Sequence, residues 1–218
     1  MTRQKRIRFA SLENMDNVID GRRCQADWFI KVCGLQETVI LELGCGRAEY
    51  TLALARCRPD IKVIGIDRNG SRLWKGANSA RHEGLSNALF LRAPVEHLEE
   101  HFPPGRVSEI WLPFPDPLPK NRQARHRLVS PLFLQRYRRL LLPGGVVYLK
   151  TDNSDLVDFA QQSVLAAGGR ILETIDRRLE DYEELEAVQT TYEKRYRAEG
   201  RAIYVRQFCL DRLPESNK

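Results

Sequence analysis

Residues 39–48 read VILELGCGRA, and this stretch decides the fold class. Its first five residues are apolar apart from Glu42, which is typical of a buried strand. Gly44 and Gly46 follow at once and permit a sharp turn in which the backbone approaches a ligand closely. A helix is predicted directly afterwards, over residues 50–58. Strand, glycine turn and helix in this order predict the first unit of a parallel α/β sheet.

The rest of the chain continues the alternation of strands and helices. The predicted strands cover residues 61–66, 88–91, 109–112, 146–149, 170–174 and 202–210, and the predicted helices cover residues 71–82, 132–142, 155–166 and 191–199. The Pro-Gly-Gly at 143–145 should end the helix before it. We therefore predict an α/β fold with a doubly wound, mostly parallel sheet whose last strand is antiparallel. The predicted domain organisation is a basic, flexible arm over residues 1–20 and a single domain over residues 21–218.

Composition narrows the class of protein. The 218 residues include 35 Lys and Arg against 29 Asp and Glu, and the pI is near 9.2, which suits a polyanionic partner such as nucleic acid. The five cysteines and four histidines show no metal-ligand spacing, and an odd cysteine count argues against a disulfide framework. No apolar run suits a signal peptide or a membrane helix. We expect a cytoplasmic protein that needs no metal and no membrane.

Two acidic side chains near the glycine turn indicate the kind of ligand. Glu42 lies inside the first strand, and Asp67 ends the second strand, in the sequence IGID. Carboxylates at these places suit a ligand with an amino group and a ribose diol, because they accept hydrogen bonds from both. S-adenosylmethionine carries these groups and no phosphate. The stretch resembles the first two motifs of the Rossmann-like, class I S-adenosylmethionine-dependent methyltransferases, which implies that Gly44 and Gly46 also border the cofactor.

A second unusual stretch follows the fourth predicted strand. Residues 113–120 read PFPDPLPK, so prolines stand on both sides of Asp116. Ligands of open α/β sheets lie beyond the carboxyl ends of the strands, so this loop should border the reacting centre. Prolines fix φ and stiffen the loop, which would hold the carboxylate in one place.

The loop resembles the FPDPWPK motif of the tRNA (guanine-N7)-methyltransferase family, with Leu118 in place of the tryptophan. Residues 150–153, KTDN, and 190–193, TTYE, resemble two later motifs of that family, in the same order. The similarity extends from about Glu42 to Tyr204. It implies transfer of a methyl group from S-adenosylmethionine to N7 of guanosine 46 in the variable loop of tRNA, forming 7-methylguanosine.

The resemblance also assigns roles to residues. It implies that Asp116 is catalytic and borders the cofactor, and that Glu42 and Asp67 bind the cofactor. It implies that the tRNA or its target guanosine is bound by Lys120, Asp152, Thr190, Thr191, Tyr192 and Glu193.

Two positions depart from the family pattern. Pro94 stands where the family has an Asp that holds the adenine, and Glu96 is the candidate substitute for binding the cofactor. Gln123 stands in place of the family's His, so any role of that His is absent.

Basic residues cluster directly after the Asp116 loop. Residues 120–127, KNRQARHR, contain Lys120, Arg122, Arg125 and Arg127, which we expect to contact phosphates of the tRNA. Further basic residues stand in the predicted arm, at Arg136, Arg138 and Arg139, and at Lys194, Arg195 and Arg197.

Two other functions remain open at the level of sequence. A small-molecule methyltransferase of the same fold would not need the basic residues that follow the Asp116 loop. A non-catalytic RNA-binding relative would fit the departure at Pro94 but not the presence of Glu42, Asp67 and Asp116. The sequence does not fix the oligomeric state, for which a monomer is the expectation.

Overall fold

The computed structural model describes residues 10–24, 27–34, 36–172 and 190–210. Within them an eight-stranded sheet has the order β1-β4-β3-β2-β5-β6-β8-β7. The strands are β1 (Val18–Asp20), β2 (Val39–Leu43), β3 (Lys62–Ile66), β4 (Ala88–Arg92), β5 (Val107–Pro113), β6 (Leu141–Thr151), β7 (Arg170–Leu172) and β8 (Tyr204–Cys209). Strands β1 to β6 pair in parallel, whereas β8 runs antiparallel to both β6 and β7. The predicted α/β fold with an antiparallel last strand is therefore confirmed.

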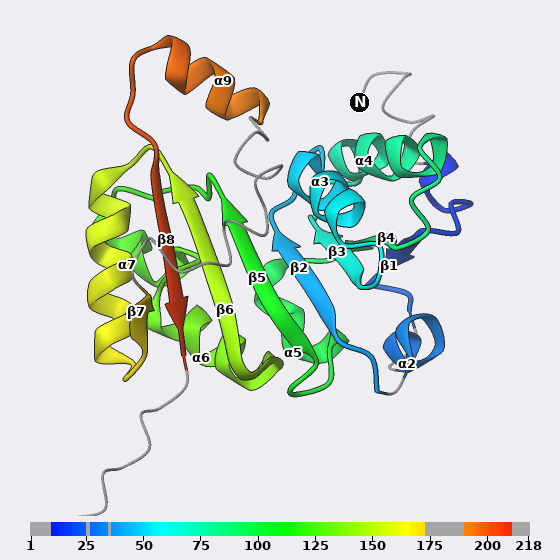
Figure 1. Ribbon diagram of the computed structural model, residues 1–218, viewed down its shortest axis with the longest axis horizontal. Helices are drawn as coiled ribbons and strands as arrows, with labels where there is room; N and C mark the ends of the chain where they lie inside the picture. The colour runs from blue at the N-terminus through cyan, green and yellow to red at the C-terminus, as the bar shows by residue number, and fades with distance from the viewer. Residues whose placement is uncertain (1–9, 25–26, 35, 173–189, 211–218) are drawn as a thin grey trace, which may run out of the picture.

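Helices cover both faces of the sheet (Figure 1). They are α2 (Trp28–Cys33), α3 (Glu49–Cys57), α4 (Gly70–His82), α5 (Leu98–His101), α6 (Pro131–Leu140), α7 (Ser154–Ala166) and α9 (Thr191–Ala198), with 3-10 turns η1 (Val95–His97) and η2 (Asn121–His126). Helices α2, α5, α6 and α7 contribute to one apolar core, and α3 and α4 to another on the opposite face. Within β2, Leu41 and Leu43 belong to the first core and Ile40 to the second, which is the alternation of a strand buried on both sides.

The N-terminal part differs from the prediction. Residues 18–20, assigned to a flexible arm, form β1 and pair with residues 90–92 at the edge of the sheet. Leu12 and Met15 are buried in the core beside α3 and α4. A three-residue strand has too short an apolar pattern to be recognised in the sequence, and it forms because β4 offers an open edge. Residues 1–9 of the predicted arm lie outside the described residues.

The Pro-Gly-Gly at 143–145 also behaves differently from the prediction. Helix α6 ends at Leu140, before the proline, and β6 begins at Leu141 rather than at Val146. Leu141 pairs with Val107, and the register with β5 then shifts before it continues from Glu109 and Val146. The two glycines are thus an irregularity inside a long strand. The predicted strand over 170–174 is seen over its described part, Arg170–Leu172.

The topology places the site at one end of the sheet. Strand β2 lies between β3 and β5, and the chain leaves β2 toward β3 through α3. A crevice forms at such a switch point beyond the carboxyl ends of the strands. Helix α9 lies above that end, over the carboxyl ends of β5 and β6 (Figure 1).

Candidate active site

The turn after β2 is shaped by left-handed backbone conformations. Gly44 and Gly46 have φ of 72° and 57°, which residues with a side chain rarely adopt. A Cβ built on Gly44 would meet no heavy atom within 4 Å, so the space beside the turn is open. The N–H groups of Gly44 and Cys45 donate to the carbonyl of Ile66 at 2.8 and 3.0 Å and fix the turn on the end of β3. The turn thus offers exposed backbone next to free space, which fits a ligand such as S-adenosylmethionine.

Glu42 is almost completely buried beneath this turn, with 2% of its surface exposed. Its Oε2 atom accepts a hydrogen bond of 2.6 Å from the Thr51 N–H and another from the Thr51 hydroxyl, at the start of α3. Burial raises the pKa of Glu42 to about 8, although both bonds from Thr51 oppose the shift. Glu42 is therefore held in a fixed position between the turn and α3.

Asp67 is positioned at the end of β3, as predicted. Its Oδ2 accepts from the Gly46 N–H at 3.0 Å, and its Oδ1 accepts from the Asn69 N–H at 2.7 Å. These two bonds tie the turn after β2 to the turn after β3. The carboxylate therefore lies beside Gly46 with a fixed orientation, which suits it for a ribose diol.

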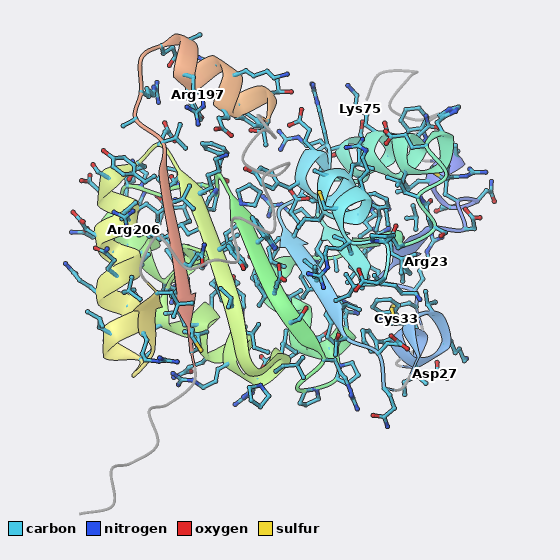
Figure 2. All side chains as sticks on the ribbon, viewed as in Figure 1. Arg23, Asp27, Cys33, Lys75, Arg197 and Arg206 are labelled. Carbon is cyan, nitrogen blue, oxygen red and sulfur yellow. The ribbon has the colours of Figure 1, made fainter. Side chains whose placement is uncertain are left out.

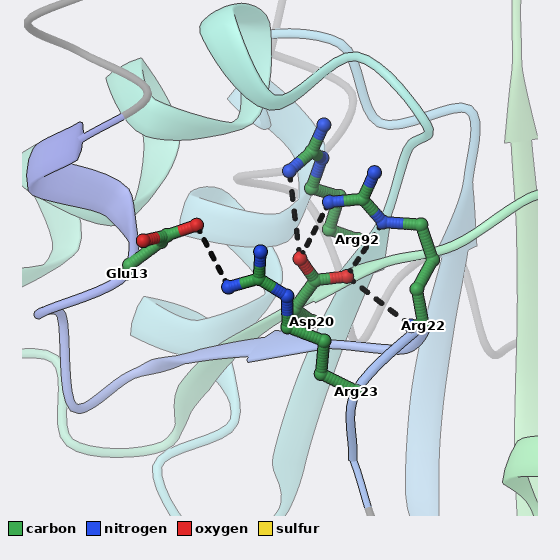
Figure 3. A network of polar contacts seen from close by, with 5 residues as sticks. All are labelled: Glu13, Asp20, Arg22, Arg23 and Arg92. Carbon is green, nitrogen blue, oxygen red and sulfur yellow. Dashed lines mark hydrogen bonds and ion pairs between the residues drawn. The ribbon is translucent and has the colours of Figure 1, made fainter.

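The segment after β4 carries Pro94 and Glu96, the positions that the resemblance connects with the adenine. Pro94 precedes η1, and Glu96 lies within η1 with an exposed side chain. Arg92, the last residue of β4, pairs with Asp20 at 3.5 Å, and Asp20 also binds Arg22 at 2.7 Å (Figure 3). Asp20 stands at the end of β1, so the edge strand missed in the sequence contributes to this end of the sheet.

The loop that carries Asp116 follows β5. Asp116 is exposed, and Lys120 is exposed at the start of η2. The Phe114 N–H donates to the carbonyl of Lys150 at 2.7 Å, which joins the loop to the end of β6. Both loop and glycine turn therefore lie at the same end of the sheet, on neighbouring strands β5 and β2.

Helix α9 is held over this end by polar contacts. Glu193 is fully buried and pairs with Lys150 of β6 and Arg197 of α9, each at 2.8 Å. The same Lys150 donates a 2.8 Å hydrogen bond to the hydroxyl of Tyr50 in α3. Figure 2 shows Arg197 on this helix. Glu193 thus joins α9 to β6 and, through Lys150, to α3.

The other residues of the TTYE motif have two kinds of environment. Thr190 and Thr191 are hydrogen-bonded within the fold, whereas Tyr192 is exposed. Thr190 caps α9 by accepting from the Glu193 N–H, and it is buried. Thr191 donates its N–H and hydroxyl to Glu49 at 2.9 and 2.6 Å, next to the glycine turn. Tyr192 is 53% exposed and is the member of the motif most available to a substrate.

Asp152 lies at the same end and is bound by a basic residue. Its carboxylate pairs with Arg201 at 2.8 Å, in the segment between α9 and β8. Arg201 was not predicted from the sequence, and Lys150 was noted there only as a member of the KTDN motif, with no role of its own. Their pairings become visible only in the fold, because more than forty positions separate the two members of each pair along the chain.

The basic residues do not form a uniform rim. Arg122 and Arg125 of η2 are exposed. Arg138 instead donates to the carbonyls of Leu210 and Ala167, and Arg139 pairs with Glu99 at 2.7 Å. Arg127 turns inward and donates to the carbonyl of Leu118 in the Asp116 loop. Arg127, which we expected to contact phosphate, thus already has a carbonyl acceptor within the fold, as does Arg138.

Two further features concern metals and membranes. In the part of the chain that the structure describes, no group of three or more His, Cys, Asp or Glu side chains could hold a metal ion. The helices among these residues are too short or too polar to span a membrane.

The fold matches that of known methyltransferases. A solved structure titled as an antibiotic-related methyltransferase superposes with a TM-score of 0.60 at 22% identity, covering 85% of this chain and 92% of that one. The antibiotic-resistance methyltransferase Kmr superposes with a TM-score of 0.59 at 20% identity, covering 88% and 95%. A family model described as "Putative methyltransferase" matches residues 36–206. The fold and the site define a methyltransferase of the class I, Rossmann-like type.

Sequence relatives narrow this class. The tRNA (guanine-N(7)-)-methyltransferase of Christiangramia forsetii is 37% identical, covering 94% of this chain and 97% of the relative. The protein of the same name from Cytophaga hutchinsonii is also 37% identical, covering 95% and 98%. The chain belongs to the tRNA (guanine-N7)-methyltransferase family.

Proposed function

We propose that this protein transfers a methyl group from S-adenosylmethionine to N7 of guanosine 46 in the variable loop of tRNA. The observation that carries the proposal is the meeting of three segments at one end of the sheet. They are the glycine turn with Glu42 and Asp67, the Asp116 loop, and α9. Each comes from a different part of the chain, and each carries a motif of the family.

S-adenosylmethionine, when bound, supplies a methyl group on a positively charged sulfur. The open space beside Gly44 and the carboxyl groups of Glu42 and Asp67 are the features of this chain that would hold it. Glu96 is the candidate contact on the adenine side. Guanine N7 carries an available lone pair, so the protein needs no strong base to activate it.

Asp116 would stabilise the positive charge that appears on the purine during transfer. A carboxylate about 4 Å from a unit charge contributes ~1 to 4 kcal/mol for dielectrics between water and a protein surface. The proline-rich loop would hold Asp116 in place, and correct alignment of guanine with the methyl group would provide most of the remaining acceleration.

The tRNA would be bound around this centre. We assign Lys120, Asp152 and the segment from Thr190 to Glu193 to the guanosine and its neighbouring nucleotides. Within that segment the exposed Tyr192 would face the substrate, while the buried Glu193 would act on it indirectly, by holding α9 in place. The exposed Arg122 and Arg125 would contact phosphates. We expect the protein to act as a monomer in the cytoplasm, where its substrate is found.

The experiment is incubation of the protein with S-adenosylmethionine and unmodified tRNA, followed by nucleoside analysis. We expect 7-methylguanosine from a tRNA with guanosine at position 46 and none from the same tRNA with adenosine there. Methylation of another atom, or of small molecules only, would refute the proposal. Calorimetric titration with S-adenosylmethionine separates a non-catalytic relative, which would show little binding.

A further inference from the structure

The backbone of the Asp116 loop has few N–H groups that could bond it to neighbouring elements. Prolines occupy positions 113, 115, 117 and 119, so four of the seven residues from 113 to 119 have no N–H to donate. Proline restricts its own φ but donates no backbone hydrogen bond to a neighbouring element. The position of Asp116 relative to the sheet therefore depends on contacts that other segments make with the loop.

Two residues of the loop have unfavourable backbone conformations. Phe114 has φ of 50° and Leu118 has φ of 44°, the left-handed region that residues with large side chains avoid. Such conformations persist where the surrounding structure imposes them, and they gather at functional sites. They stand two residues before and two residues after Asp116, so both ends of the catalytic segment need to be held.

The first end is held by β6 and α9. The Phe114 N–H donates to the Lys150 carbonyl at 2.7 Å. The Phe114 ring lies against Tyr196 of α9, with 5.7 Å between the ring centroids.

The second end is held by one side chain. The Nε and Nη2 atoms of Arg127 donate to the Leu118 carbonyl at 3.3 and 3.1 Å. The guanidinium lies over the ring of Phe159 in α7, 4.3 Å from its centroid. Arg127 is only partly exposed, unlike Arg122 and Arg125 in the same basic segment. A stacked guanidinium with two donors directed at one oxygen holds that carbonyl in a defined direction.

We propose that Arg127 is a positioning residue, which holds the Asp116 loop in its working conformation through the carbonyl of Leu118. This inference rests on the proposed function and extends it. The guanidinium acts on the loop and not on the tRNA, although it belongs to a basic run that resembles a phosphate-binding segment. Its loss should therefore lower the rate of methyl transfer and leave tRNA affinity intact.

The test compares Arg127→Lys with Arg127→Met and with Arg122→Gln as the matched exposed control. Lysine keeps the positive charge but cannot direct two fixed donors at one carbonyl oxygen or stack as a planar group. We expect single-turnover methyl transfer at saturating tRNA and cofactor to fall roughly ten- to a hundredfold in both Arg127 variants, since small misplacements are costly. The salt dependence of tRNA binding should stay at the wild-type slope in both. Arg122→Gln, which removes an assigned phosphate contact, should instead change that slope by about one unit.

A second comparison tests whether Arg127 acts through Asp116. In an Asp116→Asn background, Arg127→Lys should cause little further loss, because the group being positioned is already disabled. Phe159→Leu, which keeps an apolar contact but removes the ring under the guanidinium, should give a smaller loss of rate. It tests the same contact if both Arg127 variants fail to fold in a thermal melt.

The possible failures can be told apart. If the wild-type protein forms no 7-methylguanosine, the proposed function fails. If the wild type is active but Arg127→Lys keeps its full rate and Arg127→Met changes only the salt slope, then Arg127 is a phosphate contact and the inference is overturned. Fully additive losses in the double variant with Asp116→Asn would also overturn it.

Discussion

At the scale of single residues, the two carboxyl groups central to the site occupy opposite environments. Asp116 is exposed on a proline-rich loop, whereas Glu42 is buried under the glycine turn. We therefore expect their substitutions to have different effects. A change at Asp116 should affect the rate of the chemical step, and a change at Glu42 should affect folding and cofactor binding.

Asp116→Asn keeps the shape of the side chain and removes its charge. If the carboxylate stabilises positive charge during transfer, single-turnover methyl transfer should fall by roughly a hundredfold or more. Binding of tRNA should persist because other residues supply it, and Glu42→Ala serves as the control for a damaged cofactor site. A near-normal rate would show that the loop only positions the base, and the catalytic assignment would move to Asp152.

Glu42 should make stability depend on pH. Its pKa in the folded protein is raised from the ordinary 4.5 to about 8, chiefly by burial. The folded state therefore favours the protonated form, so its stabilising contribution is complete below pH 4.5 and is lost as the pH rises toward about 8. Urea unfolding across this range should show the wild type losing stability relative to Glu42→Gln, which cannot ionise. A constant difference between the two proteins would contradict the assignment.

At the scale of elements, α9 is joined to the sheet by a buried ion pair. The Lys150–Glu193 pair leaves 12% of the lysine side chain and none of the glutamate side chain exposed. Removing one member of such a pair leaves a buried charge with less compensation, which is more damaging than removing both. The helix therefore depends on a contact between residues that are 43 positions apart in the sequence.

Lys150→Met should destabilise the protein by ~3 to 5 kcal/mol and expose α9 to faster amide hydrogen exchange. The double variant with Glu193→Leu should recover part of this loss, because no charge then remains buried there. Arg195→Gln is the matched control, because Arg195 forms an exposed pair with Glu199. This substitution should lower the free energy of unfolding by less than about 1 kcal/mol. Unchanged exchange in α9 of the Lys150 variant would mean that other contacts suffice to hold the helix.

At the scale of the whole molecule, an excess of basic residues becomes a binding surface only where their side chains are available. The formal charge of +6 gives no indication of which residues these are. The fold uses Arg138 and Arg139 to join α6 to other segments, and it leaves Arg122 and Arg125 exposed beside the site.

Affinity for tRNA should therefore fall steeply with salt, and the steepness should depend on particular residues. Arg122→Ala and Arg125→Ala should each lower the log–log slope by about one unit or slightly less. Arg138→Ala should leave the slope unchanged, because its guanidinium is bound to backbone carbonyls. Binding measured by filter retention between low and moderate salt provides the check. A slope that no arginine variant alters would refute the assignment of this surface.

The sequence by itself determined the features that depend on local pattern. The apolar run of residues 39–43, the glycines after it and the acidic residues at strand ends predicted the fold class and the positions of Glu42, Asp67 and Asp116. These signals are local because strand periodicity, tight turns and proline restriction act between neighbouring residues.

Only the tertiary structure decided which side chains are engaged with one another. Nothing in the sequence distinguishes Arg127 from Arg125, yet one holds the Leu118 carbonyl and the other is exposed. The burial of Glu193 against Lys150 and the pairing of β1 with the edge of β4 also depend on segments that are distant in sequence. Such contacts are set by packing, which brings together groups from distant parts of the chain. Their separation in the sequence does not indicate their distance in space.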